Sequence, residues 1–141
     1  MNVEPLMTRK VITIEKDDSL LAIREIFENV KFHHLLVVDG QKLIGVISDR
    51  DLLSAIPPFS EKECDAVALN KEAHQIMSRT LITVDAKTSI EQAGNLLLKN
   101  NISCLPVISP QDTVEGILTW KDILNFYLEN KEVLLKEWLK K

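Results

Sequence analysis

The sequence predicts a mixed α/β (α+β) fold built from two similar halves, and three observations predict it. Residues 7–9 (Met-Thr-Arg) recur 70 positions later as residues 77–79 (Met-Ser-Arg). Short β-branched runs alternate with stretches whose apolar residues recur at helical spacing, as strands alternating with helices do. Hydrophobic residues make up 45% of the 141 positions, enough for the core of one ordinary domain. Each half is small for independent stability, so we expect the two to share a core.

The repeat extends through most of the chain. The matching segments keep their order: 11–14 with 81–84, 35–38 with 105–108 and, after one residue inserted in the second copy, 45–53 with 116–124. A recurrence of this length makes an internal duplication the primary feature of the sequence. We expect a first half at 1–57, a linker at 58–75 and a second half at 76–141.

Each copy is expected to run strand–helix–strand–strand–helix. In the first copy, Ser19 precedes residues of helical periodicity and is a good N-cap, and the dipeptide Asp39-Gly40 favours a two-residue hairpin turn. Ser48 is expected to cap a helix that reaches about Ala55 and stops at the prolines that follow. The expected elements are strands at 11–14, 35–38 and 43–47 and helices at 20–30 and 48–55.

The second copy repeats this order, with strands at 81–84, 105–108 and 114–118 and helices begun by Ser89 and Thr119. One helical turn is expected in the polar linker near 61–68. The last helix is expected to be long, from Lys121 to about Leu139, with a substantial apolar face. That face either packs on the first half or forms a dimer interface.

Composition narrows the class of protein. The net charge of −4 argues against binding nucleic acid, which needs a basic face. Two widely separated cysteines give neither a disulfide framework nor a metal-ligand spacing. No apolar run is long enough to span a membrane, and the first ten residues lack the apolar core of a signal peptide. These features predict a cytoplasmic protein.

The most informative motif stands where a strand enters a helix in each copy: Gly45-x-x-Ser48-x-x-Asp51 and Gly116-x-x-Thr119-x-x-Asp122. A helix N-terminus presents unpaired N–H groups to a phosphate, a hydroxyl there can donate to the phosphate, and a carboxylate one turn later can accept from ribose hydroxyls. Glycine in the strand lets a ligand or another backbone come close. The alternative is a capping box without a ligand, and the repetition of the motif favours a ligand site.

These motifs, together with the strand Ile-Thr-Ile at 12–14 and the segment Ile-Ser-Cys-Leu-Pro-Val at 102–107, resemble the CBS domain family as a tandem pair, or Bateman module. The resemblance covers nearly the whole chain. It implies two β-α-β-β-α halves packed through their sheets with pseudo-twofold symmetry. It also implies two clefts between the halves that take adenosine nucleotides.

Carried over to this sequence, the resemblance makes Asp51 and Asp122 the ribose-binding carboxylates and Ser48 and Thr119 the phosphate-side hydroxyls. Each cleft would also take residues from the opposite half: Ile82 and Ser103 for the Asp51 cleft, and Ile12 and His33 for the Asp122 cleft. The isoleucines would sandwich the adenine and offer backbone hydrogen bonds.

The first half departs from the family pattern. Leu36 stands where the second half has Pro106, and His33-His34 stand where it has Ser103-Cys104. The clefts are therefore expected to be unequal. The histidines either approach a phosphate or are ordinary surface residues, and too few acidic residues stand near them for a metal site.

Four further residues stand near the predicted clefts. Arg50 and Lys121 occupy equivalent motif positions and either neutralise phosphate or lie in solvent. Trp120 either contacts a ligand or partner or packs on its neighbours, and Cys104 is expected to be a small core residue.

The function expected from these features is regulatory binding of AMP, ADP or ATP, with no chemistry, no required cofactor and no metal. The output would pass to a separate effector protein, and a homodimer is the family default. The alternatives are a ligand-free dimerisation or interaction module, a binder of S-adenosylmethionine, an enzyme acting on nucleotides, which lacks a visible general base, and a DNA-binding regulator. No nucleic-acid or membrane partner is expected.

Overall fold

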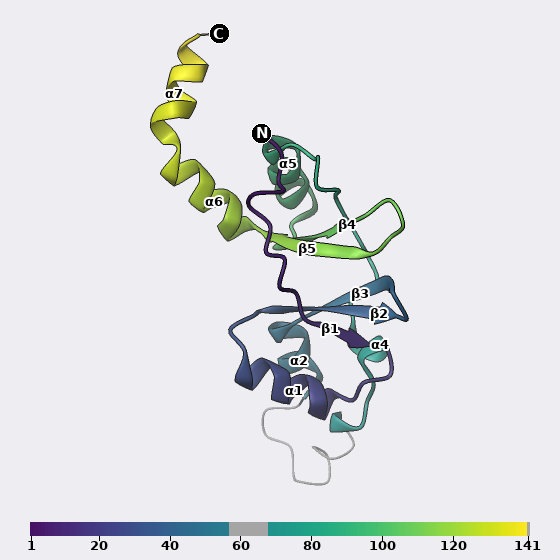
Figure 1. Cartoon of the computed structure of the whole chain (residues 1–141). Coiled ribbons are helices and arrows are strands. Elements are labelled where there is room, and N and C mark those ends of the chain that lie inside the picture. The colour runs from purple at the N-terminus through teal and green to yellow at the C-terminus, as the bar shows by residue number, and fades with distance from the viewer. Residues whose placement is uncertain (57–67, 141) are drawn as a thin grey trace. The chain divides into compact units, whose positions relative to one another are not determined.

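The structure is a computed structural model that describes residues 1–56 and 68–140 (Figure 1). Most of the linker turn expected near 61–68 lies outside these residues. The strands are β1 (Thr13–Glu15), β2 (His34–Asp39), β3 (Lys42–Ser48), β4 (Cys104–Ile108) and β5 (Val114–Thr119). The helices are α1 (Leu20–Asn29), α2 (Asp49–Ala55), α4 (Ala73–Ile76), α5 (Ile90–Asn100), α6 (Trp120–Glu129) and α7 (Lys131–Leu139). The predicted mixed α/β class and the order of the main elements are confirmed.

The chain forms two compact units, and each is assembled from separated stretches of sequence. One contains residues 11–81 and 112–114, and the other contains residues 1–10, 82–111 and 115–141. The first ten residues thus fold with the second repeat, and the segment that precedes the second repeat folds with the first. The sequence boundaries at 57 and 76 stay a prediction.

In the unit of the first repeat, β1, β2 and β3 form one sheet in that order. β1 pairs with β2 in parallel, β2 pairs with β3 antiparallel, and a register shift lies between Val37 and Val38. Helices α1, α2 and α4 supply the rest of this unit's apolar core, whose buried members are Ile14, Leu20, Ile23, Leu35, Val37, Ile47, Leu52 and Ala73.

In the unit of the second repeat, β4 and β5 form a two-stranded sheet. The strand predicted at 81–84 is reduced to an isolated bridge between Val84 and Val107, so the second copy keeps only the end of that pairing. Its buried core residues are Val3, Met7, Val84, Ile90, Ala93, Leu97, Leu105, Val107, Leu118 and Ile123. Val3 and Met7 show that the N-terminal segment is part of this core.

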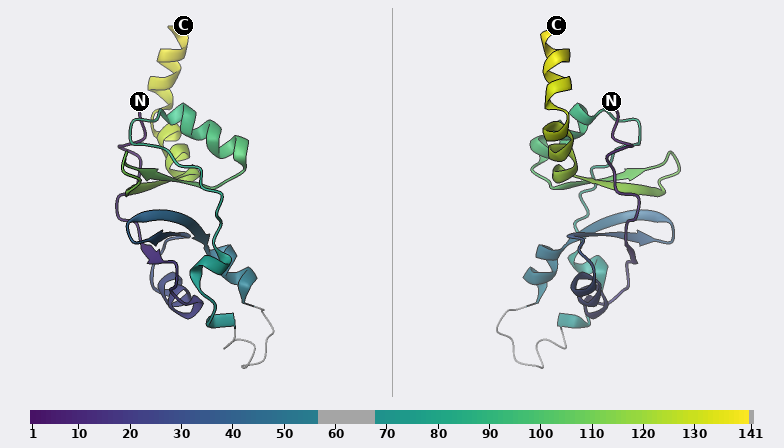
Figure 2. Two further views of the ribbon diagram at one scale, coloured as in Figure 1. Left: turned by 90° about the vertical axis from the view of Figure 1, so that its right-hand side faces the viewer. Right: turned by 60° about the vertical axis from the view of Figure 1, so that its left-hand side comes forward.

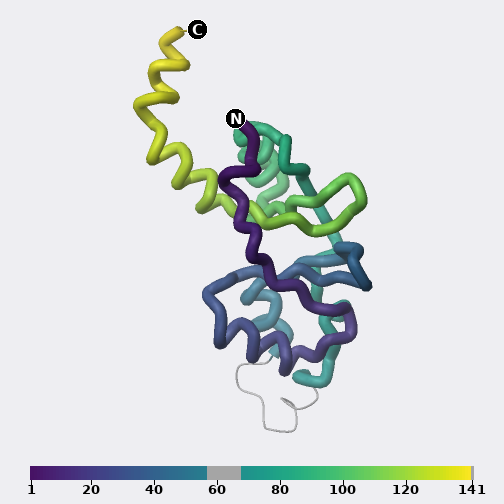
Figure 3. Tube along the Cα trace, viewed as in Figure 1, coloured from purple at the N-terminus to yellow at the C-terminus, as the bar shows by residue number. Residues whose placement is uncertain are grey.

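The backbone hydrogen bonds that hold the exchanged segments occur at equivalent positions of the two repeats. Ile90 N donates to Met1 O at 3.1 Å in one unit, and Leu20 N donates to Lys71 O at 2.9 Å in the other. Thr8 and Ile117 exchange two backbone hydrogen bonds, as do Ser78 and Val46. Figure 3 shows the N-terminal segment, in purple, running beside the start of α5 and along β5. The repeat therefore begins at residue 1, although residues 1–6 and 71–76 share little sequence.

The motif glycines receive these exchanged segments. A Cβ at Gly116 would lie 2.8 Å from Thr8 O and 3.1 Å from Met7 Sδ. A Cβ at Gly45 would meet Met77, at 2.8 Å from its Cγ and closer still to its Sδ. Of the two reasons expected for glycine in this strand, the close approach of another part of the chain is the one that the structure shows.

Three local features refine the expected elements. The hairpin loop comprises Gly40 and Gln41, with Asp39 still paired to Lys42, so the turn starts one residue later than expected. Gly40 has φ of 67°, as the first central residue of a type II′ turn requires. The long C-terminal helix is interrupted at Asn130, which has φ of −114° and ψ of 15° and separates α6 from α7.

Within residues 1–56 and 68–140, no helix combines the length and apolarity needed to cross a membrane.

His34 begins β2 at a partly buried position. Desolvation lowers the pKa of its imidazole, against the opposing influence of Asp49 and with a further lowering from His33. A smaller raising influence comes from Asp51. The folded state therefore favours the neutral imidazole.

We predict that Gly116→Ala destabilises the protein by about 1–3 kcal/mol, because the new Cβ meets a backbone oxygen that cannot rotate away. Gly45→Ala should cost less, because Met77 can change rotamer. Gly94→Ala is the matched control: nothing lies within 4 Å of its Cβ position in α5, and a helical alanine should add about 0.5–1 kcal/mol. Urea unfolding measures all three, and a Gly116→Ala protein as stable as the wild type would refute the packing argument.

We predict that the free energy of unfolding falls as the pH drops below the ordinary histidine value of 6.5, because the unfolded state then binds the proton that folded His34 resists. The stabilising contribution is present above that pH and is lost toward the lowered pKa of the folded state. His34→Gln should flatten this slope between about pH 7 and 5. Urea titrations at several pH values measure it, and an equal slope in both proteins contradicts the assignment to His34.

Candidate functional site

The first predicted hydroxyl–carboxylate pair lies at the junction of β3 and α2. Ser48 N donates to Asp51 Oδ2 at 2.8 Å, and Asp51 N donates to Ser48 Oγ at 3.1 Å. Two backbone donors at the start of the helix are thereby satisfied reciprocally, which is a capping box with aspartate in place of glutamate.

The second pair repeats this arrangement at the junction of β5 and α6. Thr119 N donates to Asp122 Oδ2 at 2.8 Å, and Asp122 N donates to Thr119 Oγ1 at 3.4 Å. The hydroxyl of Thr119 also donates to Asp122 Oδ2, at 3.0 Å. A capping box is thus present at both junctions.

Capping leaves room for a second role. Within residues 1–56 and 68–140, the capping hydrogen bonds to the two carboxylates all use Oδ2, and Oδ1 of Asp51 and of Asp122 enters none of them. The capping bonds also fix the rotamer of each carboxylate before a ligand arrives. A preorganised acceptor of this kind suits a pair of ribose hydroxyls.

The residue directly after each hydroxyl distinguishes the two junctions. Asp49 Oδ2 lies 2.9 Å from His33 Nδ1, and this hydrogen bond is the main reason that the pKa of Asp49 is lowered. At the second junction stands Trp120, which is 49% exposed, with Lys121 Nζ 5.9 Å from the centre of its ring. The first helix start thus carries two carboxylates and the guanidinium group of Arg50, and the second carries one carboxylate, an aromatic ring and an ammonium group.

Asp49 is the residue near the predicted site that sequence reasoning missed. Its backbone N–H donates to His33 O at 3.0 Å, and the equivalent bond runs from Trp120 N to Ser103 O at 3.2 Å. The repeat offset relates these two bonds to each other, but it does not indicate that the loops contact the helix starts. Nothing in the sequence indicated the side-chain contact between Asp49 and His33.

The remaining predicted residues lie beside their own sheets. Ile12 is partly buried against the core of its unit, and its carbonyl accepts from Leu36 N at 3.2 Å. Ile82 is partly buried in the other unit. Each of the two predicted ligand groups takes residues from both units, and both groups stay predictions. The first is Asp51 with Ile82 and Ser103, and the second is Asp122 with Ile12 and His33.

Asp122 lines a hollow of about 320 Å³ in its unit, between the N-terminal segment and α6. Asn125, Glu129 and Asn130 supply further polar side chains to it, and Met1, Pro5, Leu6 and Phe126 supply its apolar part. The hollow combines hydrogen-bonding groups beside the carboxylate with an apolar surface.

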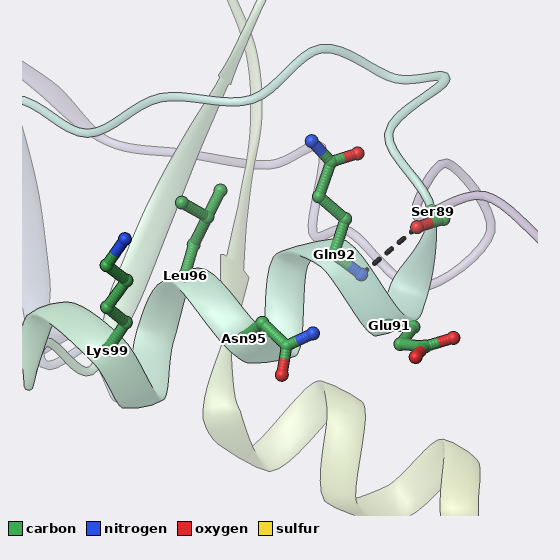
Figure 4. A pocket seen from close by; sticks show the side chains of 6 residues that line it. All are labelled: Ser89, Glu91, Gln92, Asn95, Leu96 and Lys99. Atoms are coloured by element: carbon green, nitrogen blue, oxygen red, sulfur yellow. Dashed lines mark hydrogen bonds between the residues drawn. The ribbon is translucent and has the colours of Figure 1, made fainter.

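Another hollow, of about 340 Å³, follows α5 and contains none of the predicted residues (Figure 4). Its labelled side chains include Asn95 and Lys99, and Ser89 at its end accepts from Gln92 N at 3.0 Å as the cap of α5. Ser89 is therefore a structural residue, as expected.

Cys104 is buried, and desolvation raises the pKa of its thiol to about 11. It is a core residue, as predicted. Among the described residues, no three His, Cys, Asp or Glu side chains gather in the way that a metal site requires.

The chain is similar to proteins of known family. The CBS domain model matches residues 3–58 and again residues 73–129. A CBS domain-containing protein of Dictyostelium discoideum is 29% identical over 134 residues, which are 90% of this chain and 91% of the relative. Inosine-5′-monophosphate dehydrogenase of Nitrosopumilus maritimus is 28% identical over 121 residues, but these are only 23% of that enzyme.

Two solved structures share the fold over almost their whole length. The protein CBSX2 in complex with AMP has a TM-score of 0.78 and 28% identity, covering 92% of this chain and 98% of that one. The CBS domain pair of protein MJ0100 in complex with 5′-methylthioadenosine and S-adenosyl-L-methionine has a TM-score of 0.74 and 27% identity, covering 90% and 99%. The two matches to the family model span most of the sequence, and the chain therefore belongs to the CBS domain family as a tandem pair.

Proposed function

We propose that this chain is a regulatory sensor that binds AMP, ADP or ATP reversibly and without chemistry. The observation that carries the proposal is the recurrence of one hydroxyl–carboxylate arrangement at two strand-to-helix junctions, in a family with a relative in complex with AMP. In this proposal, Asp51 and Asp122 hold ribose, Ser48 and Thr119 lie on the phosphate side, and Ile12 and Ile82 contact adenine.

The junction at α6 fits a phosphate better than the junction at α2. Arg50 and Lys121 supply a positive charge at equivalent positions of the two junctions, so the cation does not distinguish them. Helix α6 is ten residues long, so its terminal N–H groups carry an appreciable partial charge. At α2, Asp49 adds a second negative charge next to Ser48, and the helix has only seven residues. Phosphate repulsion is therefore greater at the first junction.

S-adenosylmethionine is the second candidate ligand, and Asp49 favours it. Its sulfonium group is cationic, so an additional carboxylate attracts it where the same carboxylate repels a phosphate. The relative MJ0100 is in complex with this ligand. The two junctions can thus serve two adenosine ligands of opposite charge.

The remaining expectations concern partners. We propose a homodimer, supported by exposed leucines at equivalent positions of the repeat: Leu53 on α2 and Leu124 on α6 are 73% and 47% exposed, whereas the preceding Leu52 and Ile123 are buried. We further propose a cytoplasmic location and an effector protein that reads the bound state. Such signalling requires that the ligand bind two conformations with different affinity.

We predict that calorimetric titration with AMP, ADP, ATP and S-adenosylmethionine gives saturable heat, and that Asp51→Asn and Asp122→Asn each weaken binding about tenfold or more. Asparagine keeps an oxygen that can accept the capping bond, so its stability cost is small, and urea unfolding of the same variants serves as the control. Asp→Ala at either position should also cost about 0.5–2 kcal/mol of stability through the lost cap. Absence of heat with all four ligands at millimolar concentration would remove the proposal.

We predict that Asp49→Asn changes selectivity in a defined direction. Affinity for ATP should rise about tenfold and affinity for S-adenosylmethionine should fall, because one negative charge is removed. Glu91→Gln on α5, a neutralisation within the hollow that contains no predicted site residue, is the matched control and should change neither affinity. Equal effects of the two variants would show that Asp49 acts only through net charge.

A further inference from the structure

A hollow of about 450 Å³ lies in the unit of the first repeat, away from the motif at the start of α2. Its lining consists of five charged or titratable side chains and two apolar ones: Lys16, Asp17, Ile44, Glu72, His74, Met77 and Arg79. None of them is a proposed ligand residue, and Ile44 precedes Ser48 on β3 by about 13 Å of extended strand. Figures 1 and 2 show α4, in teal, beside the end of β1, where His74 N donates to Lys16 O at 3.0 Å.

Most of the charged groups at the hollow already have partners within the protein. Lys16 Nζ lies 3.1 Å from Asp39 Oδ2, and His74 Nε2 lies 2.6 Å from Glu72 Oε2. Both contacts join a basic group to a carboxylate. Neither pair therefore leaves an isolated charge in the hollow.

Asp17 and Arg79 are the two exceptions. Within residues 1–56 and 68–140, neither side chain belongs to an ion pair, with the other or with any third residue. Arg79 Nη2 donates to His74 O at 3.3 Å, which uses one of the five N–H donors of the guanidinium group and leaves its charge unpaired. The hollow thus presents one positive and one negative group that no other described residue neutralises.

The second repeat shows which group an arginine takes at this place. Arg9 is equivalent to Arg79, and its Nη2 lies 2.9 Å from Glu4 Oε1. The residue equivalent to Glu4 in the first repeat is His74, whose imidazole is hydrogen-bonded to Glu72. Arg79 therefore lacks the carboxylate that its counterpart has, and a ligand carboxylate can supply it through charge-assisted hydrogen bonds.

We propose that this hollow binds a free amino acid with an apolar side chain. The α-carboxylate of the ligand pairs with Arg79, its α-ammonium group pairs with Asp17, and its side chain lies against Ile44 and Met77. A simple anion fits less well because Asp17 repels it, and a simple cation fits less well because Arg79 repels it. The volume of the hollow lies in the range of about 300–1,000 Å³ that is usual for small-molecule sites.

Met77 connects this hollow to the packing of the unit. Its side chain is the one that a Cβ at Gly45 would meet, and the next residue, Ser78, exchanges two backbone hydrogen bonds with Val46. A bound amino acid therefore contacts the exchanged segment directly. Because a ligand that binds only the folded state adds to the free energy of unfolding, the amino acid should stabilise this unit.

The test is calorimetric titration of the full chain with L-leucine and L-methionine, which should both give saturable heat. Arg79→Gln and Asp17→Asn should each weaken binding about tenfold or more, because each removes one charge-assisted contact. Arg9→Gln is the matched control, since Arg9 occupies the equivalent position in the other unit and is paired with Glu4. Absence of heat with both amino acids at millimolar concentration, or an equal loss of affinity in Arg9→Gln, would overturn the proposal.

Ligand analogues test the two charges and the apolar contact separately. N-acetyl-L-leucine lacks the ammonium group and L-leucinamide lacks the carboxylate, so each should bind about tenfold more weakly than L-leucine. Glycine should also bind about tenfold more weakly, because it buries no apolar side chain. Binding of either leucine analogue as tightly as L-leucine would show that only one charge is recognised, which contradicts the assignment of a free amino acid.

A substitution at position 74 tests the comparison between the repeats. His74→Glu supplies the carboxylate that Glu4 provides in the other unit, so it should pair with Arg79 and weaken leucine binding about tenfold. His74→Gln is the neutral control and should retain binding, with urea unfolding as the check on folding. Unchanged leucine binding in His74→Glu would refute the assignment of Arg79.

Titration of Arg79→Gln with AMP distinguishes this site from the proposed nucleotide function. AMP binding should be unchanged, because Arg79 is not a proposed ligand residue. Parallel loss of AMP and leucine binding would place Arg79 in the nucleotide site and overturn the proposal. Leucine binding by a chain that binds no adenosine ligand would leave the amino-acid site standing and remove only the nucleotide function.

Discussion

The close approach of the exchanged segments to the two motif glycines is the constraint on which each unit depends. At Gly116 the backbone of Thr8 occupies the space that a side chain would need, and at Gly45 the side chain of Met77 does so. The same contact adds an edge segment to β5 and β3 and carries Val3 or Ala73 into the respective core. Both ends of each exchanged segment are hydrogen-bonded, so the strand that enters the motif helix is held at a fixed position. The capping carboxylate at the start of that helix is thereby fixed as well.

The motif Gly-x-x-[Ser/Thr]-x-x-Asp thus combines structural and proposed binding roles in neighbouring residues. Glycine admits the exchanged segment, and the hydroxyl and carboxylate close the capping box. The part left for a ligand is the carboxylate oxygen outside the capping bonds and the helix end itself. A residue pair that is fixed by the fold loses little conformational entropy on binding. This small entropy loss explains how a junction that already caps a helix can also recognise a ligand.

Much of the fold followed from local sequence signals. Ser19 and Ser89 cap their helices, and the alternation of strands and helices is correct, because caps and apolar periodicity act over a few residues. The exchange of segments was missed because residues 1–6 and 71–76 share backbone geometry and not side chains. The break at Asn130 was missed because the apolar pattern continues across it. The contact between Asp49 and His33 joins positions sixteen residues apart, which no local pattern encodes.

The reciprocal exchange constrains how a protein of this kind can be divided or assembled. A second repeat that began at residue 76 would lack the core residues Val3 and Met7, and no segment would pack against its Gly116. Its own first residues, including Met77, would lose their contact with Gly45. Two such fragments could restore these contacts only by exchanging their N-terminal segments, as in a domain-swapped dimer. If a single-repeat ancestor exchanged its N-terminal segment with a second copy, gene duplication and fusion would place both segments on one polypeptide. An association between two chains would then become a folding step within one chain. The tandem arrangement then makes formation of the pair independent of protein concentration.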